Sequence, residues 1–273
     1  DQRLSRGLGD VYKRQVQPTC APVNDSLMEL MIMVDACKRA SARQITAVIP
    51  YYGYARADRK TSGRESITAK LTANLLEKSG VDRVLAMDLH SAQIQGYFDI
   101  PCDHIYGSPV LIDYLETLNL EEVVVVSPDV GGVARARAFA KQMNDAPLAI
   151  IDKRRAAHNI AESLTVIGEV KGKTAILIDD MIDTGGTICS GASLLKREGA
   201  KRIFACASHA VFSPPSYERL SAKDLFEQVI VTNSIPVVVK NNFPQLKVLS
   251  VANMLGEAIW RIHEESSVSS MFR

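Results

Sequence analysis

The chain has 273 residues, which at about 150 residues per domain corresponds to two domains or one large one. Its 32 Lys and Arg residues nearly balance 31 Asp and Glu residues, so the net charge of +1 excludes a global basic field that would recruit nucleic acid or an anionic membrane. No apolar run approaches the ~18 residues that span a bilayer, and no signal-peptide pattern opens the sequence. We therefore expect a soluble globular protein that binds any anion through a local site.

The cysteines point to a reducing environment. They are odd in number, widely spaced and without a C-x-x-C pair, so neither a disulfide framework nor a zinc site is indicated. They are Cys20, Cys37, Cys102, Cys189 and Cys206. We expect a cytoplasmic protein.

The first fifteen residues differ from the rest of the sequence. Residues 1–15 carry no initiator Met, no helical or strand periodicity and no apolar face. They are either a mobile native terminus or a segment joined to a shortened gene. We expect this segment to be unrelated to the rest of the chain, and disordered or artefactual.

From Val16 the sequence alternates between β-type runs and amphipathic helices. Ser26 and Glu29 have the spacing of a capping box ahead of an apolar helical stretch, and Gly80 is a typical helix stop. The elements predicted for this first half are a helix at 26–40, a strand at 45–50, a helix at 67–78 and a strand at 81–88. Together they form a β-α-β unit.

The same alternation continues through the second half. The predicted elements are strands at 123–126, 148–151, 164–170, 175–178, 202–208 and 228–231, a helix ending near 144 and a helix at 187–197. Strands that alternate with helices imply mainly parallel sheets covered by helices. We predict an α/β fold with two such sheets, an N-terminal domain at 16–150 and a C-terminal domain at 151–273.

One sequence pattern occurs twice. In both Ser127-Pro-Asp-Val-Gly-Gly132 and Asp179-Asp-Met-Ile-Asp-Thr-Gly-Gly-Thr187, a β-branched strand leads through Asp into a Gly-Gly turn and a helix. The repetition suggests duplicated domains.

The second copy of the pattern carries the strongest chemical signal. An apolar strand delivers Asp179 and Asp180 at its carboxyl end, where open α/β sheets bind ligands. The following residues offer successive backbone amides, two glycines and two hydroxyls at a helix N-terminus, which together form an anion cradle. They are Asp183, Thr184, Gly185, Gly186 and Thr187. Because carboxylates suit hydroxyl groups rather than phosphate, the motif predicts a phosphorylated sugar; the alternative is an acidic strand end before an ordinary glycine-rich turn.

At this motif the chain resembles the phosphoribosyltransferase-type fold, whose ribose 5-phosphate loop has this form. The segment from Asp88 to Pro101, Asp-Leu-His-Ser-Ala-Gln-Ile-Gln-Gly-Tyr-Phe-Asp-Ile-Pro, and the segment from Tyr52 to Lys60 are similar to the ribose-phosphate pyrophosphokinase family. The similarity extends from Val16 to Arg273. It implies two phosphoribosyltransferase-type domains, with the ribose 5-phosphate loop in the second and the C-terminal tail returning to the first.

The resemblance also implies an activity. The enzyme would transfer the pyrophosphoryl group of Mg-ATP to the 1-hydroxyl of ribose 5-phosphate, giving phosphoribosyl pyrophosphate and AMP. Asp183 to Thr187 would hold the 5-phosphate, and Asp179 and Asp180 the ribose hydroxyls. Two other functions share parts of the pattern: a nucleobase phosphoribosyltransferase, and a non-catalytic regulatory homologue of the synthetase.

The nucleotide and metal side of the site rests more heavily on the resemblance. Asp88 and His90 are two residues apart at a strand end and so point to one face, although a lone histidine is more often structural. The resemblance implies that His90 contacts the metal-ATP unit, that Asp129 is a second Mg²⁺ ligand, and that Arg56 contacts ATP. Taken without the resemblance, Arg56 would belong to a solvated basic loop.

A charge-rich stretch opens the second domain. Residues 152–158 contain little apolar content, which predicts an exposed mobile loop. The resemblance implies that this loop closes over ATP and that Lys153 and Arg155 stabilise charge during pyrophosphoryl transfer. A permanently solvated loop is the alternative.

The two ends of the chain complete the comparison with the family. The C-terminal residues Ser267, Val268, Ser269 and Phe272 look like part of a regulatory phosphate or ADP site between subunits, whereas physics alone predicts a frayed terminus. The resemblance further implies a homohexamer built from dimers. Family chains begin before the point matching Val16, with a strand and an adenine-binding loop, so we expect this chain to keep the ribose-phosphate site but to bind ATP poorly, assemble poorly, or both.

Overall fold

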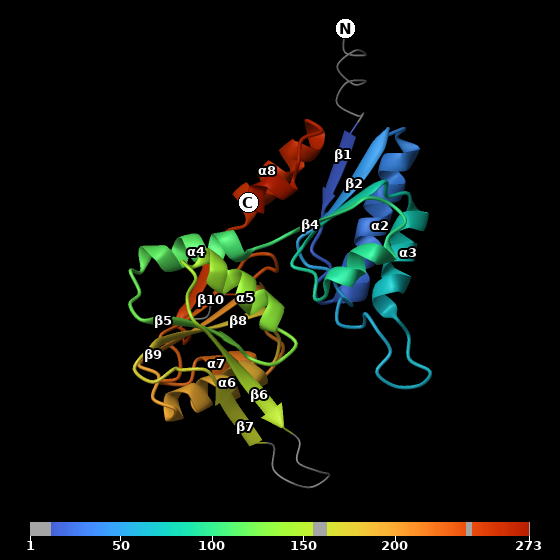
Figure 1. Ribbon diagram of the computed structural model, residues 1–273. Coiled ribbons are helices and arrows are strands. Elements are labelled where there is room, and N and C mark those ends of the chain that lie inside the picture. Colours follow the sequence, from blue (N-terminus) through green and yellow to red (C-terminus); the bar gives the residue numbers. More distant parts are fainter. Residues whose placement is uncertain (1–11, 155–162, 239–241, 273) are drawn as a thin grey trace. The chain divides into compact units, whose positions relative to one another are not determined.

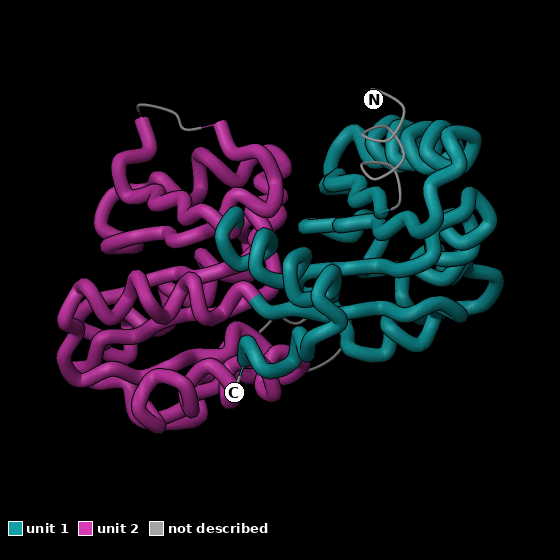
Figure 2. Tube along the Cα trace, turned by 90° about the horizontal axis from the view of Figure 1, so that it is seen from above, with its two compact units in different colours: residues 1–106, 252–273 teal, residues 107–251 magenta. Residues whose placement is uncertain are grey.

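The computed structural model describes residues 12–154, 163–238 and 242–272, and it divides into two compact units (Figure 2). Unit 1 comprises residues 1–106 and 252–273, and unit 2 comprises residues 107–251. Residues 155–158 of the predicted loop, Arg155 among them, lie outside the described residues. No helix within the described ranges is long and apolar enough to cross a bilayer.

Unit 1 is built on a parallel four-stranded sheet (Figure 1). Its strands, in spatial order, are β1 (Tyr12–Val16), β2 (Gln44–Ile49), β3 (Arg83–Met87) and β4 (Cys102–Ile105). Alternate residues of β2 and β3 pack against apolar residues of two helices, which gives this unit its core. The helices of unit 1 are α2 (Val23–Arg39), α3 (Thr68–Ser79), α8 (Ala252–His263) and the short helices η1 (Ala92–Tyr97) and η2 (Ser269–Phe272).

Two predictions for unit 1 were wrong and one was confirmed. Residues 12–15 belong to strand β1, because backbone pairing with β2 orders a polar edge strand that has no apolar pattern. Helix α2 begins at Val23, and the Ser26 hydroxyl donates to the Cys20 carbonyl (3.0 Å) rather than capping a helix. Gly80 does end α3, with a φ of 114° that only glycine adopts without strain.

Unit 2 contains a seven-stranded sheet with helices on both faces (Figure 1). The spatial order is β11 (Leu246–Leu249), β10 (Gln228–Thr232), β9 (Arg202–Ala210), β8 (Thr174–Ile182), β5 (Val123–Ser127), β6 (Leu148–Arg154) and β7 (Ser163–Ile167). Every described pairing in it is parallel except β6 with β7. One face packs against α4 (Ser108–Thr117) and α5 (Val133–Gln142), and the other against α6 (Gly186–Arg197) and α7 (Ser216–Leu220). The predicted α/β fold with mainly parallel sheets flanked by helices is confirmed.

The division into units differs from the predicted boundary at residue 150. Strand β5 pairs with β8, with Val125 opposite Ile176, and residues 107–150 therefore belong to unit 2 together with the larger sheet. The two Gly-Gly turns consequently follow neighbouring strands of one sheet, and they do not mark two duplicated domains. Sequence alternation locates strands but carries no information about which strands pair, because pairing is a long-range choice.

Candidate functional site

The carboxylates that end β8 lie at the carboxyl edge of the larger sheet. The described pairing of β8 with β5 stops at Leu177, whereas its pairing with β9 continues to Ile182. Asp179 and Asp180 therefore extend past β5, beside the turn that leads into α5. The Asp180 side chain is 3% exposed and that of Asp179 is 23% exposed, so this edge presents two largely buried acids.

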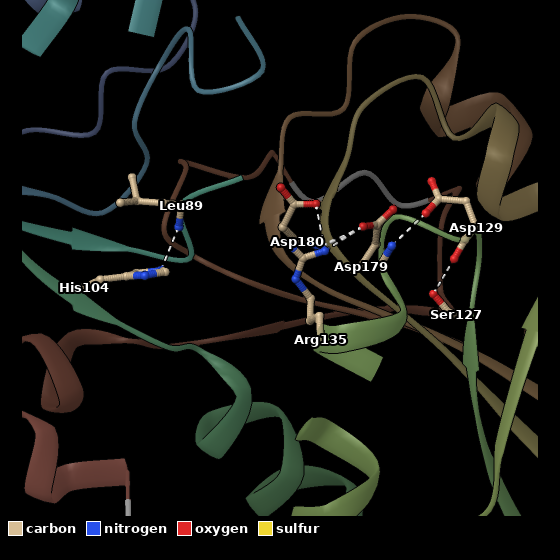
Figure 3. A network of polar contacts seen from close by, with 8 residues as sticks. Leu89, His104, Ser127, Asp129, Arg135, Asp179 and Asp180 are labelled. Carbon is tan, nitrogen blue, oxygen red and sulfur yellow. Dashed lines mark hydrogen bonds and ion pairs between the residues drawn. The ribbon is translucent and has the colours of Figure 1, made fainter. Parts of the chain in front are cut away.

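Arg135, from the first turn of α5, contacts both acids (Figure 3). Its Nη1 lies 3.2 Å from Asp179 Oδ1 and 3.3 Å from Asp180 Oδ1, while the Asp180 amide donates to Asp179 Oδ1 at 2.9 Å. Burial raises the pKa of Asp179, the neighbouring Asp180 raises it further, and the Arg135 charge opposes both. Sequence reasoning missed Arg135; its position three residues after Gly132 was the available signal.

The turn between β8 and α6 contains the remaining residues predicted to bind ribose 5-phosphate. Gly185 has a φ of 74°, and a Cβ there would lie 3.4 Å from Leu220, so the turn requires glycine. Thr184 and Thr187 are exposed and Asp183 is half-buried. Arg219, also missed by sequence reasoning, donates from Nη1 to the Thr184 carbonyl at 3.2 Å. The structure thus brings all seven predicted residues together on one strand-turn-helix segment.

The turn after β5 is arranged differently. Asp129 is exposed, and its Oδ1 accepts a hydrogen bond from the Gly132 amide at 2.8 Å. The Ser127 hydroxyl donates to the Asp129 carbonyl at 2.7 Å (Figure 3). The predicted metal ligand therefore also closes its own turn.

In unit 1, Arg56 and His90 are both exposed and lie on two loops that Asp58 joins. Asp58, which is 6% exposed, accepts hydrogen bonds from the Ser91 hydroxyl (2.7 Å) and from Gln93 Nε2 (3.1 Å). The Tyr97 hydroxyl donates to the Asp58 carbonyl. Asp58 thereby fixes the loop of Arg56 against the residues that follow His90. Asp58 lies in the segment of Arg56, which without the resemblance was expected to be a solvated basic loop. The sequence does not reveal its role, because the partner side chains are more than thirty residues away.

The backbone just before His90 is held by a second histidine. The Leu89 amide donates to His104 Nε2 at 3.0 Å (Figure 3). The His104 ring packs on Tyr106, with the ring centroids 4.6 Å apart. Asp88, the residue before Leu89, has a φ of 40°. The turn that presents His90 is therefore anchored from strand β4.

Lys153 lies in a strand rather than in a loop. It is exposed and stands opposite Leu164 in the antiparallel pair of β6 and β7. The predicted mobile loop at 152–158 is therefore wrong for residues 152–154. The end of β6 at residues 152–154 pairs with the edge strand β7 and lies beyond the described pairing with β5, so its charged side chains resemble a loop in sequence.

The C-terminal residues are held within unit 1. Arg261 donates to the Ser267 carbonyl at 3.1 Å, and the Ser267 and Ser269 hydroxyls are 2.9 Å apart. The Phe272 ring packs edge-on against Tyr106 with centroids 5.6 Å apart, and Val268 is buried. The expectation of a frayed terminus is wrong for residues 267–272.

The donors in the described residues suit Mg²⁺ better than a metal that needs a full protein cage. No group of three His, Cys, Asp or Glu side chains among these residues could hold a metal ion. Mg²⁺ binds through one or two carboxylates together with waters and substrate phosphates, so an exposed carboxylate such as Asp129 is sufficient.

Fold and site together define an open α/β protein with paired acids and a glycine turn at the carboxyl edge of a mainly parallel sheet. Residues 9–80 match the family model for the N-terminal domain of ribose phosphate pyrophosphokinase, and residues 154–273 match that for the phosphoribosyl synthetase-associated domain. The chain belongs to the ribose-phosphate pyrophosphokinase family. The first match begins before Val16, so the expectation that the whole segment 1–15 is unrelated is wrong from residue 9 onward.

Individual relatives support this assignment. Ribose-phosphate pyrophosphokinase of Prochlorococcus marinus subsp. pastoris is 94% identical over 94% of this chain and 78% of the relative. The protein of the same name from Synechococcus elongatus is 76% identical over 97% of this chain and 79% of the relative. The crystal structure of phosphoribosylpyrophosphate synthetase from Mycobacterium smegmatis matches with a TM-score of 0.85 at 46% identity, over 93% of this chain and 83% of that one.

Proposed function

We propose that the protein transfers the pyrophosphoryl group of ATP to the 1-hydroxyl of ribose 5-phosphate, giving phosphoribosyl pyrophosphate and AMP. The observation that carries this proposal is the segment from Asp179 to Thr187, in a chain 94% identical to a ribose-phosphate pyrophosphokinase. A strand end with two acids, followed by a glycine turn and a helix N-terminus, supplies acceptors for hydroxyl groups beside donors for a phosphate.

The two ends of the segment bind different groups of the phosphorylated sugar. Asp179 and Asp180 bind the ribose hydroxyls, because carboxyl oxygens accept hydrogen bonds from hydroxyl groups. The 5-phosphate lies at the N-terminus of α6, where the helix dipole and the amides of the turn favour an anion. The two exposed hydroxyls of the turn, Thr184 and Thr187, add donors to the phosphate.

The proposed reaction also requires Mg²⁺ and ATP. By the family resemblance, His90 and Asp129 would each be a metal ligand, and Arg56 and His90 would contact the nucleotide. When bound, the metal neutralises charge on the triphosphate. The hydrogen bonds of Asp58 support the part of this proposal that concerns unit 1, because they join the Arg56 loop to the residues that follow His90.

Lys153 and Arg155 stabilise the negative charge of the pyrophosphoryl group during its transfer. Such transfer depends on positioning and cations rather than on a covalent nucleophile.

A regulatory anion site is formed by C-terminal residues: Ser267, Val268, Ser269 and Phe272. We place the activity in the cytoplasm, which agrees with five cysteines outside any disulfide.

The active form is a homo-oligomer, by resemblance a hexamer. Two helices of unit 1 expose pairs of apolar side chains at i, i+4 spacing, which agrees with contacts between subunits. These are Met28 and Ile32 on α2, and Leu71 and Leu75 on α3.

The test is formation of AMP from ATP by the whole chain, with and without ribose 5-phosphate and Mg²⁺. We expect AMP only when both are present, and a raised KM for ribose 5-phosphate in Thr187→Val, which removes one hydroxyl. Ser193→Ala is the matched control, because Ser193 lies on the same helix and its hydroxyl donates to the Cys189 carbonyl. AMP release that does not depend on ribose 5-phosphate would contradict the proposal, as would the absence of turnover in the chain extended to the full length of its relatives.

A further inference from the structure

One guanidinium group serves two carboxylates at the edge of the larger sheet. Arg135 is the third residue of α5, the helix that begins directly after the β5 turn. Its Nη1 lies 3.2 Å from Asp179 Oδ1 and 3.3 Å from Asp180 Oδ1 (Figure 3). The Arg135 side chain is 28% exposed, so most of the cation is enclosed beside the two acids.

Two consecutive carboxylates at a buried strand end repel each other. Burial favours their neutral forms, and the pKa of Asp179 is raised accordingly. When a carboxyl group is protonated, one of its oxygens becomes a hydrogen-bond donor and the group has fewer acceptor positions. Protonation would therefore weaken its binding to a sugar hydroxyl. Arg135 supplies the positive charge from α5 that opposes this change, and Asp180 supplies the negative charge from the same strand.

We propose that Arg135 is a positioning residue of the phosphosugar site, which holds Asp179 and Asp180 in the one arrangement that binds the ribose hydroxyls. This inference rests on the proposed function. It makes the β5 turn a part of the sugar site, because that turn sets the start of α5 and hence the position of Arg135.

The geometry favours arginine over lysine at this position. A guanidinium is planar, carries five donors in a fixed fork and stays charged, so it engages two carboxylates and fixes their rotamers. A lysine ammonium supplies the charge as a flexible point without that orientation. The lysine variant should therefore recover part of the affinity but not all of it.

The experiment measures binding of ribose 5-phosphate to the whole chain by calorimetry. We expect Arg135→Gln to weaken binding by at least about tenfold, since a hydrogen-bonded charge is lost. Arg135→Lys should lie between this variant and the wild type. Arg137→Gln is the matched control: it removes the same charge from an exposed position on the same helix and should stay within about twofold of the wild type.

A double-mutant cycle separates positioning from general destabilisation. If Arg135 acts through Asp179, the loss caused by Arg135→Gln should largely disappear in an Asp179→Asn background. Equal losses in both backgrounds would overturn the inference, as would equal binding by Arg135→Gln and Arg137→Gln.

A ligand-free measurement distinguishes failure of the inference from failure of the proposed function. Carboxyl carbon NMR should show the Asp179 and Asp180 pair taking up protons at higher pH in Arg135→Gln than in the wild type. If the wild type does not bind ribose 5-phosphate, the proposed function fails. Unchanged carboxyl titration in Arg135→Gln overturns the role of Arg135 whatever the ligand.

Discussion

The turns after β5 and β8 share a sequence pattern and lie on neighbouring strands, yet their carboxylates have different partners. Asp129, three residues before Gly132, accepts a hydrogen bond from the amide of that glycine and closes its own turn. Asp179 and Asp180 precede their glycines by five or more residues, still within β8, and they meet Arg135 of the neighbouring helix. The same sequence pattern therefore places acids against different groups: a backbone amide of its own turn for Asp129, and a side chain of the neighbouring helix for Asp179 and Asp180.

The backbone of the two turns differs as well. Gly132 has a φ of −82°, which any residue adopts, whereas Gly185 has a φ of 74°. The β8 turn therefore needs its glycine for conformation, and the β5 turn needs its glycine mainly for space near Ser127. The same strand-Asp-Gly-Gly pattern thus occurs in two different turn structures. Only the β8 turn combines largely buried acids with a glycine in the left-handed conformation.

The largest expected effect tests the enclosed acids. Because the pKa of Asp179 is raised, the folded protein holds a proton that the unfolded chain releases above about pH 4. Stability should therefore fall as the pH rises through the neutral range, by an amount of the order of a few kcal/mol, since each unit of pKa shift corresponds to about 1.36 kcal/mol. Asp179→Asn should remove this loss and exceed the wild type in stability at alkaline pH, as measured by urea unfolding at several pH values.

Asp129→Asn is the control for this measurement, because it makes the same change at the exposed acid of the other turn. The Asp179→Asn variant should lose more of the wild-type pH dependence of unfolding than the Asp129→Asn variant does. If Asp179→Asn keeps the full wild-type dependence of unfolding free energy on pH, the burial of Asp179 has no measurable effect on stability. The difference between the acids of the two turns would then be contradicted.

The second prediction compares the glycines. Gly185→Ala should destabilise the protein by about 1–2 kcal/mol, the cost of a left-handed conformation for an L-residue. Gly132→Ala should cost less, about 1 kcal/mol at most, because its φ suits any residue and the one tight contact of a Cβ would be with the Ser127 hydroxyl at 3.0 Å. Chemical denaturation of both variants is the measurement; equal losses would show that φ does not distinguish the turns.

Much of unit 2 could be predicted from sequence, and the limits have physical reasons. The apolar run of β8, its acids and the glycine turn are local features, so the segment from Asp179 to Thr187 was found directly. Arg135 and Asp58 act on residues that lie forty-four and about thirty-five positions away, and such contacts depend on strand order rather than on spacing. Strand β1 and the charged end of β6 escaped prediction because edge pairing orders a backbone without an apolar pattern.

A third and smaller effect tests the closure of the β5 turn. Asp129→Ala removes the acceptor of the Gly132 amide and should cost about 1 kcal/mol, the usual value for a lost side-chain cap. Asp129→Asn keeps an oxygen acceptor and should recover most of this loss. Thermal unfolding of the two variants is the measurement. Equal stability of Asp129→Ala and the wild type would mean that the turn is held by its backbone alone.

The smallest expected effect concerns Arg219. Because this side chain is exposed, Arg219→Ala should change the unfolding free energy by less than about 0.5 kcal/mol. Its hydrogen bond to the Thr184 carbonyl nevertheless restrains the β8 turn, so ribose 5-phosphate should bind about threefold more weakly, as expected for one modest hydrogen bond. Calorimetry on Arg219→Ala and on the control Arg202→Ala measures the difference. Arg202 is a suitable control because it donates to Glu227, and neither residue belongs to the β8 turn. Loss of affinity in both variants would assign the effect to net charge rather than to the turn.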